Sequence, residues 1–383
     1  MPLTFVLAPD SFKQSMSAAQ ACQAMQRGIQ NVLPDALCIH VPMADGGEGT
    51  VDTLISSSKG QRIPCEVTGP LPDQRIQTYF GVIDAGKAAI IEMAKANGID
   101  LLEPARRNPL LTSTCGTGEM IKSALDLEAS KIIIGLGGSV TNDAGAGMAQ
   151  ALGARFLDAQ GLEIQACGGN LDQIIAIDLS ELDSRLADIE IIIASDVNNP
   201  LCGPNGASAI FGPQKGATPE MVKQLDQNLS HFADLVARHI GRDHRHVAGA
   251  GAGAAGGLGF GLMAFTAASI RSGVELIIQQ TDLANKIAQA DYVLTGEGKL
   301  DHQTKLGKTP FGVAQVAQKF NKPVLAFAGL VGDGIESLYE SGFSQIIRIN
   351  PPDCSREEAL KNAEVNLEKA VSKTIKNIEE QRI

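Results

Sequence analysis

The amino-acid sequence predicts an α/β protein with two α/β domains. Apolar runs suited to buried parallel strands recur along the chain, and amphipathic helical patterns lie between several of them. The most Rossmann-like of these runs stand near the two ends of the chain. Alternation of this kind is typical of layered α/β folds, in which functional loops follow the carboxyl ends of the strands.

The predicted strands are short apolar runs, and helices with one apolar stripe separate several of them. The strands are residues 4–8, 131–138, 189–195, 291–296, 322–329 and 344–349. The helices are residues 18–32, 311–320 and 357–378. In the last helix, Leu360, Leu367 and Ile375 recur at the spacing of a helix with one buried side.

The domain organisation is predicted to be discontinuous. The first strand and the last three are the most Rossmann-like, yet they come from opposite ends of the chain. Residues 66–94 alternate instead like paired strands with turns between them. We therefore predict one parallel-sheet domain from residues 1–64 and 281–383 and an inserted mixed α/β domain from residues 65–280. Two domains in series are the simpler alternative.

Composition bounds the class of protein. The chain has 383 residues, a net charge of −11 and a pI near 5.1, which argues against binding nucleic acid or anionic membranes. Seven scattered cysteines without a C-x-x-C pair favour a reducing compartment over disulfides or a zinc site. The sequence has neither a signal-peptide pattern nor an apolar run of about 18 residues. We expect a cytoplasmic protein, as a monomer or a homodimer.

Two glycine motifs approach known nucleotide-binding patterns but depart from them. HQTKLGKT ends like a P-loop, yet His302 stands where the first glycine belongs. GAGAAG, residues 251–256, matches G-x-G-x-x-G but follows a polar segment rather than a strand. Close backbone packing, or a loop at a helix start that touches substrate, is the favoured interpretation of this motif. His244 and His246, in the preceding polar segment, are expected in a solvated loop.

A stronger signal follows the strand at residues 131–138. Ser139, Asn142 and Asp143 stand between glycines, and a helical pattern begins near Ala146. A turn of this kind directs free N–H groups and the positive end of the helix dipole toward an anion. The alternative is a helix N-cap without a ligand. We favour a ligand-binding role.

Carboxylates and lysines also follow other strands. Asp10, Ser11 and Lys13 come just after the first strand, and Asp45 and Glu48 lie among glycines at residues 44–50. With Glu297 and Asp301, these carboxylates supply the hard oxygen ligands that Mg²⁺ takes together with phosphate oxygens and water. Plain Asp-Gly turns are the alternative.

The last candidates are a base and two cations. Asp196 follows the strand at residues 189–195, where a carboxylate is placed to accept a hydroxyl proton; capping of the next turn is the alternative. Lys215 and Arg271 are candidates for binding a substrate carboxylate, or else solvated surface cations. In residues 291–304, a strand is expected to break into a loop, Thr295–Gly298, behind which Lys308 reaches a phosphate.

Taken together, these motifs resemble those of the bacterial type I glycerate kinases. Nine of them occur in order and cover essentially the whole chain, with small departures at Val140, Ala144 and Ser195. They are APDSFKQSMSA, VPMADGGEGTVDTL, VTGPL, IEMAKANGIDLL, TSTCGTGEMI, GLGGSVTNDAGAGMAQALGA, SDVNNPLCGPNGASAIFGPQKGA, GAGAAGGLG and LTGEGKLDHQT…GKTPFGVA.

The resemblance implies two α/β domains, one of them flavodoxin-like and formed by both ends of the chain, with the active site in the cleft between them. The activity that it implies is ATP-dependent phosphorylation of D-glycerate. It implies mainly the 2-hydroxyl as acceptor, giving 2-phospho-D-glycerate and ADP, in the breakdown of glycerate, glycolate or glucarate. Phosphoryl transfer needs cations and N–H groups around the phosphates, Mg²⁺ bridging them and a base at the acceptor.

From these requirements of phosphoryl transfer we assign each candidate residue a role, as a hypothesis. Asp196 is the base and Lys13 neutralises the moving phosphoryl group. The remaining assignments are Asp10, Asp45 and Glu48 for Mg²⁺, with Asp45 also counted as catalytic; Thr295, Gly296, Glu297, Gly298 and Lys308 for the nucleotide; and Ser11, Ser139, Asn142, Asp143, Lys215 and Arg271 for the substrate.

Three alternatives stay open. The product can be 3-phosphoglycerate instead, since both hydroxyls belong to one three-carbon acid. A non-kinase sugar-acid enzyme, such as a dehydrogenase or dehydratase, is the second alternative, for which GAGAAG is the only cofactor signal. The third is a protein that binds the metabolite without turnover.

Overall fold

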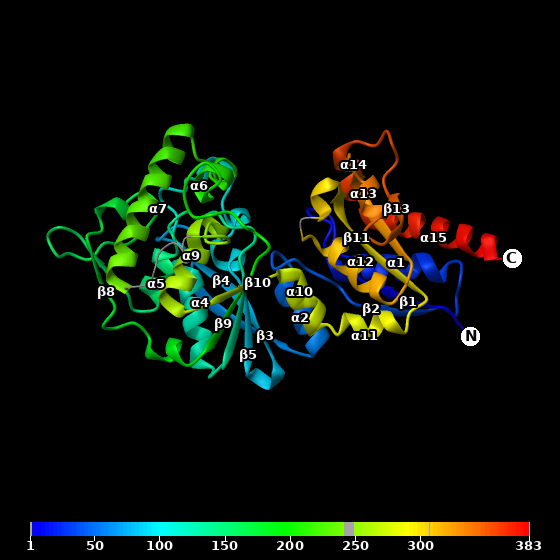
Figure 1. The fold of residues 1–383 in the computed structure, drawn as a ribbon, viewed down its shortest axis with the longest axis horizontal. Coiled ribbons are helices and arrows are strands. Elements are labelled where there is room, and N and C mark those ends of the chain that lie inside the picture. The colour runs from blue at the N-terminus through cyan, green and yellow to red at the C-terminus, as the bar shows by residue number, and fades with distance from the viewer. Residues whose placement is uncertain (1, 241–248, 306, 383) are drawn as a thin grey trace. The chain divides into compact units, whose positions relative to one another are not determined.

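The computed structural model describes residues 2–240, 249–305 and 307–382, and this part of the chain forms two compact units (Figure 1). Unit 1 comprises Met1–Asp45, Asp52–Ser58 and Val274–Ile383, and unit 2 comprises Gly46–Val51 and Lys59–Gly273. The predicted fold class, with a parallel sheet built from both chain ends and a second mixed α/β domain, is confirmed. The main crossings between the units follow Ser58 and Gly273, and the short segment Gly46–Val51 also belongs to unit 2. His244 and His246 lie outside the described residues.

The sheet of unit 1 has five parallel strands in the order β13-β12-β11-β1-β2. Their bounds are β1 Thr4–Leu7, β2 Leu37–His40, β11 Tyr292–Leu300, β12 Val324–Val331 and β13 Phe343–Arg348. Parallel strands that are covered on both faces read as continuous apolar runs, which is why the segments of β1, β11, β12 and β13 stood out in the sequence. The sequence analysis missed β2, an edge strand without buried residues. Since all five strands run the same way, their carboxyl ends lie at one edge of the sheet.

Helices α1 (Ala18–Gln30) and α15 (Ala363–Arg382) pack against each other in unit 1 (Figure 1). A Cβ at Gly28 would lie 2.6 Å from the carbonyl oxygen of Glu368, so glycine permits this close approach. The predicted helix 357–378 is in fact two helices, α14 (Arg356–Lys361) and α15. The other helices of this part of the chain are α2 Thr50–Ser58, α10 Gly273–Gln280, α11 Leu283–Ala288, α12 Thr309–Lys319 and α13 Glu336–Tyr339.

Strand β11 is longer than predicted, and this changes the expected loop Thr295–Gly298 into strand. Gly296 pairs with Phe327, Glu297 with Ala328, and the pairing with β12 continues to Leu300. Both strands continue side by side, so their backbone groups satisfy one another and no turn is needed before Asp301. The glycines therefore lie within a strand, where they permit a close backbone approach.

Unit 2 contains a six-stranded mixed sheet in the order β10-β9-β6-β5-β4-β3. The pairs β3–β4 and β4–β5 are antiparallel, and the pairs β5–β6, β6–β9 and β9–β10 are parallel. The strands are β3 Gln61–Thr68, β4 Arg75–Ile83, β5 Ala88–Glu92, β6 Lys131–Gly135, β9 Glu190–Ala194 and β10 Ser269–Arg271, with a separate pair β7 Arg155–Leu157 and β8 Ala176–Asp178.

Helices α3 Ala94–Asn97, α4 Cys115–Asp126, α5 Ala146–Ala151 and α9 Ala254–Thr266 contribute to the apolar core that includes Ile132, Ile134 and Ile193 of this sheet. Helices α6 Ala207–Phe211 and α7 Pro219–Ile240 belong to a second apolar core, around Phe156 and Phe232. Across the described parts of both units, none of the helices combines the length and the apolar character that crossing a bilayer requires.

Candidate active site

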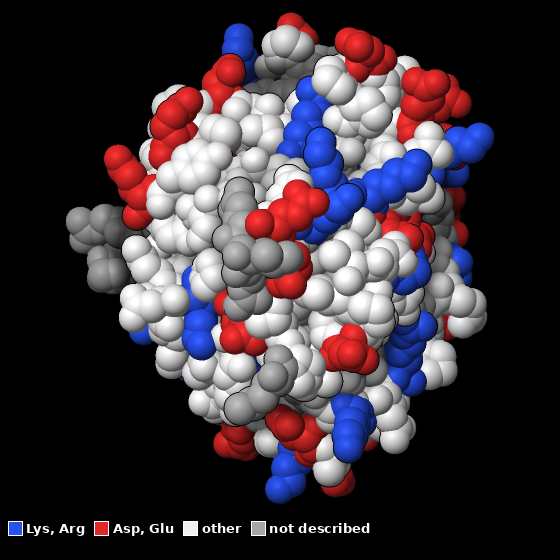
Figure 2. Space-filling model, turned by 90° about the vertical axis from the view of Figure 1, so that its right-hand side faces the viewer, with Lys and Arg blue, Asp and Glu red and all other residues white. Residues whose placement is uncertain are grey.

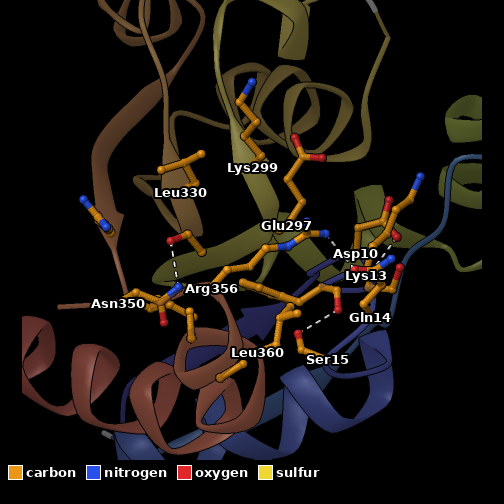
Figure 3. Close-up of a pocket in the computed structure, with 18 of the residues that line it drawn as sticks. Asp10, Lys13, Gln14, Ser15, Glu297, Lys299, Leu330, Asn350, Arg356 and Leu360 are labelled. Atoms are coloured by element: carbon orange, nitrogen blue, oxygen red, sulfur yellow. Dashed lines mark hydrogen bonds between the residues drawn. The ribbon is translucent and has the colours of Figure 1, made fainter. Parts of the chain in front are cut away.

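A cavity of about 740 Å³ opens in unit 1 where the parallel strands end (Figure 3). Residues 10–15 follow β1, and residues 297–299 belong to the end of β11. Arg348 ends β13, and residues 349 and 350 follow it. Asp45 and parts of β12 and α14 complete its wall. A volume of this size lies within the usual range for a small-molecule site, roughly 300–1,000 Å³. The carboxyl edge of an open parallel sheet is where such folds bind ligands.

Asp10 is held in the cavity by hydrogen bonds from three sides. Its backbone N–H donates to Gly296 O over 2.9 Å, and its carboxylate accepts from the N–H of Ser11 and from Thr309 Oγ1, both over 2.6 Å. Burial and the nearby charge of Asp45 raise the pKa of Asp10 to about 7, although its hydrogen bonds act in the opposite direction. Carboxylates with raised pKa values in a cavity are typical of functional sites.

Glu297 is the third carboxylate of this group. Burial raises its pKa to about 7, the charge of Lys308 opposes that rise, and the charges of Asp10 and Asp45 add to it. Lys308 Nζ lies 3.6 Å from Glu297 Oε1. Three acidic side chains thus interact through space at the sheet edge.

This arrangement fits a divalent cation that is shared with a ligand. A cation beside Asp10 and Asp45 would relieve the repulsion that raises the Asp10 pKa. Among the described residues, no group of three or more His, Cys, Asp or Glu side chains forms a complete metal cage. Mg²⁺ does not need one, because it usually takes one or two carboxylates together with phosphate oxygens and water.

Basic side chains also line the cavity, although the whole protein carries a net charge of −11. In a protein of this charge, gathered cations create the local positive potential that an anionic ligand needs. Figure 2 likewise shows basic side chains gathered in the upper half of one face, whereas acidic ones lie scattered over it. The basic lining residues are Lys13, Lys299, Lys308, Arg348 and Arg356.

The residues predicted as a nucleotide loop divide into two groups. Glu297, Gly298 and Lys308 line the cavity, as does Ser11. Thr295 is fully buried, and its hydroxyl donates to the carbonyl oxygen of Ala8 over 2.8 Å. Gly296 accepts the hydrogen bond from the N–H of Asp10. Thr295 and Gly296 therefore hold the chain just after β1 in place, while Glu297 and Gly298 line the cavity.

A second polar cluster lies in unit 2, in the segment after β6. Lys215 is 1% exposed, and its ammonium group donates to Ser139 Oγ over 2.8 Å and to the carbonyl oxygen of Thr141 over 2.7 Å. Burial lowers the pKa of Lys215 to about 7, and the charge of Asp143 opposes this. These two hydrogen bonds let the ammonium group fix the position of residues 139–141, and burial shields it from solvent.

Asp143 and Asn142 have different surroundings in the same cluster. The carboxylate of Asp143 accepts from the N–H and the hydroxyl of Thr114, over 2.8 and 2.9 Å, and from two further backbone N–H groups. Burial still raises its pKa. Asn142 Nδ2 and Thr141 Oγ1 are buried without a hydrogen-bond partner. Because buried donors without a partner are rare, these two atoms mark a place for a polar ligand or water.

The remaining predicted residues of unit 2 stand at or beyond strand ends. Asp196 is half-buried two residues after β9. Arg271 ends β10 and is half-exposed, with Nη2 lying 3.5 Å from Glu190 Oε1. Glu48 is exposed and belongs to unit 2.

The GAGAAG segment packs against the Thr141–Ala144 backbone, which confirms the close-packing interpretation. A Cβ at Gly256 would overlap the carbonyl oxygen of Thr141, and one at Gly257 would lie 2.8 Å from Ala144 Cα. Gly256 also accepts a hydrogen bond from the N–H of Ala144 over 3.2 Å. These glycines therefore shape the second polar cluster.

Sequence reasoning missed four residues with site character. Arg348, Asn350 and Arg356 line the cavity, and Glu92 is 2% exposed at the end of β5, where it accepts from the N–H of Val51 over 2.7 Å. Arg348 ends β13 and Glu92 ends β5, so a search for polar residues at the carboxyl ends of strands would have found them. Arg356 comes eight residues after β13, and no pattern places it.

Comparison with known proteins identifies the family. The model of the glycerate kinase family matches residues 5–379. The chain is 49% identical to a glycerate kinase of Haemophilus influenzae over 365 residues, 95% of this chain and 96% of that protein. It is 45% identical to the glycerate 2-kinase of Escherichia coli over 95% of each chain. A crystal structure from Salmonella typhimurium LT2, assigned as glycerate kinase 2, covers all of both chains with a TM-score of 0.86 and 44% identity. This chain, an enzyme of the kinase type, belongs to the glycerate kinase family.

Proposed function

We propose that this enzyme transfers the γ-phosphoryl group of ATP to the 2-hydroxyl of D-glycerate. One observation carries the proposal: carboxylates and lysines meet in one cavity at the end of a parallel sheet, in a chain of the glycerate kinase family. The 2-hydroxyl is favoured because the Escherichia coli relative is named glycerate 2-kinase. Formation of the 3-phosphate is the alternative product.

The cavity of unit 1 is proposed to hold the phosphates. Lys308 and Lys13 neutralise phosphate charge, and the backbone at Gly298 allows close approach. Asp10 and Asp45 would hold Mg²⁺, with Glu48 as a further candidate. When bound, Mg²⁺ supplies positive charge to the phosphate oxygens. Thr309 keeps Asp10 oriented through its 2.6 Å hydrogen bond, so the carboxylate is in position before the ligand arrives.

The cluster in unit 2 is proposed to hold the acceptor acid. Asn142 Nδ2 has an unused donor, which suits a carboxylate or hydroxyl oxygen of glycerate. Lys215 acts as a positioning residue, because its hydrogen bonds hold Ser139 and Thr141. Asp196 accepts the proton of the attacking hydroxyl. Arg271 stays a candidate for the substrate carboxylate.

The cellular setting follows from the proposed chemistry. We propose that the enzyme works in the cytoplasm, where ATP is supplied and where the seven free thiols stay reduced. Its product would enter the breakdown of glycerate, glycolate or glucarate.

Phosphorus NMR of the product tests the regiochemistry. The purified chain is incubated with ATP, Mg²⁺ and D-glycerate, and phosphorus–proton correlation identifies the carbon that carries the phosphate. The proposal predicts coupling to the single C2 proton. Coupling to the two C3 protons would reassign the acceptor hydroxyl, while a nicotinamide absorbance change without ADP release would replace the kinase by a dehydrogenase.

A further inference from the structure

The cavity of unit 1 extends into an apolar part that the proposed phosphate site does not use. We call this part the apolar lobe; its residues are Leu330, Ile349, Cys354, Ala359, Leu360 and Ala363. Figure 3 shows Asp10 and Lys13 on one side of the cavity and Leu330 on the other, with Arg356 extended between them. Leu330 is 45% exposed, although it belongs to a strand that is otherwise largely buried. Exposed apolar surface in a cavity is typical of a ligand site.

The apolar side chains of the lobe suit one part of the two proposed substrates better than the others. Glycerate is a three-carbon acid with almost no apolar surface, and phosphates are charged, so neither gains from contact with Leu330 or Leu360. A nucleoside has a flat base with apolar faces and a ribose with polar edges. Resting on the proposed use of ATP, we propose that the apolar lobe binds the base and ribose of the nucleotide, with the phosphates directed toward Asp10 and Lys13.

Arg356 stands where the two parts of the cavity meet. It begins α14, and its Nη2 donates to Gln14 Oε1 over 3.0 Å. Gln14 has a φ of 65°, in the left-handed region that residues other than glycine seldom adopt. A planar guanidinium can stack on a base and donate to a phosphate at the same time. Arg356 therefore suits the junction between nucleoside and phosphates.

Asn350 supplies an oriented polar group beside the lobe. Its Nδ2 donates to the carbonyl oxygen of Gly329 over 2.9 Å, and its Oδ1 accepts from Asn366 Nδ2 over 3.0 Å. These two bonds fix which end of the amide is the donor and which is the acceptor. A primary amide keeps one further N–H and one further lone pair, which suits a ribose hydroxyl or a base edge.

Cys354 offers a direct probe of occupancy, because it lines the lobe and its thiol is free. The full chain is treated with N-ethylmaleimide, alone, with ATP or with inorganic tripolyphosphate, and labelling is quantified by peptide mapping. ATP should slow labelling of Cys354 several-fold, while tripolyphosphate, which lacks a nucleoside, should leave it unchanged. Cys65 in unit 2 is the reference thiol and should label equally in all samples.

A substitution pair gives an independent test. Leu330→Glu places a charge in the lobe and should raise the KM for ATP by about tenfold or more, the equivalent of losing one buried leucine contact, with the KM for D-glycerate unchanged. Leu37→Glu is the matched control, since Leu37 is 55% exposed in unit 1 and does not line the cavity.

The two tests separate this inference from the proposed function. If ATP-dependent turnover occurs but ATP leaves Cys354 labelling unchanged and Leu330→Glu has a normal KM for ATP, the lobe does not bind the nucleoside and the kinase proposal stands. If turnover is absent but ATP protects Cys354, the lobe assignment holds and the acceptor is wrong. Equal protection by tripolyphosphate and ATP assigns the lobe to phosphate and overturns the inference.

Discussion

The buried ammonium group of Lys215 donates a hydrogen bond to Ser139 Oγ over 2.8 Å, in a site where the lysine is only 1% exposed. Lysine is among the residues that are least often buried completely, so a site of this kind needs a reason. The same nitrogen also holds the carbonyl oxygen of Thr141. The lysine thus fixes the backbone from which Asn142 extends.

Lys215→Met should therefore lower kcat more than it raises the KM for ATP, because it frees the 139–141 segment and leaves the ATP cavity of unit 1 intact. We expect a loss of roughly 10²-fold in kcat, the scale of a misplaced reacting group. Lys223→Met, in the exposed part of α7, is the control. An unchanged kcat in Lys215→Met would remove the lysine from the catalytic account.

The lowered pKa of Lys215 also predicts a pH dependence of stability. Its folded-state pKa of about 7 lies below the ordinary 10.5, so the unfolded chain binds more protons between these values. The contribution of Lys215 to the free energy of unfolding should therefore increase as the pH rises from 7 toward 10.5. The Tm difference between the native chain and Lys215→Met, measured from pH 7 to 9, should shift in favour of the native chain. A constant difference would mean that the buried lysine keeps its ordinary pKa.

The raised pKa of Asp10 predicts the opposite pH dependence of stability in the metal-free protein. Its pKa is raised from 3.8 to about 7, so the folded state binds more protons than the unfolded state between these values and its stability falls as the pH rises through them. Asp10→Asn should therefore raise the Tm at pH 8 in the absence of Mg²⁺, with the advantage disappearing near pH 4, and it should abolish turnover. Asp35→Asn, at an exposed position of unit 1, is the control. A lower Tm for Asp10→Asn at pH 8 would refute the prediction.

Lys308 stands at the N-cap of α12 and contacts Glu297, whereas Lys319 belongs to the last turn of the same helix. Lys308→Ala should raise the KM for ATP by about tenfold or more, because a charge-assisted bond to a phosphate is lost. Lys319→Ala should leave this KM unchanged. Equal effects of the two substitutions would point to a change in helix stability.

Asp196→Asn should keep the fold and the affinity for ATP while it lowers kcat by roughly 10²-fold or more, as expected for losing a positioned base. Asp188→Asn, an exposed carboxylate just before β9, is the control. ATP affinity is measured by fluorescence titration and kcat by ADP release. A near-normal kcat would transfer the role of base to Asp45 or Asp143.

Much of this architecture could be predicted because strands that are buried on both faces leave continuous apolar runs. The ends of β1, β6 and β9 were located in this way, and with them the polar residues that follow. The burial of Lys215 was not visible, since a lysine between glutamine and glycine resembles a surface turn, and its site is formed by the distant segment 139–141.

The length of β11 and the position of Arg356 could also not be predicted from the sequence. A run containing two glycines predicts a loop, but pairing with β12 to Val331 satisfies its backbone and keeps it extended. Arg356 reaches the cavity because the chain after β13 turns back into α14, and it is the tertiary path of residues 349–355 that decides this. Local patterns carry no information on such a path.

The most direct test of the central claim is ADP release by the purified chain, with Mg²⁺ and ATP, in the presence and absence of D-glycerate. The account predicts ADP release that depends on D-glycerate, matches the phosphoglycerate formed one for one, and is lost in Asp10→Asn. No glycerate-dependent ADP release from folded protein, or undiminished release in Asp10→Asn, would contradict it.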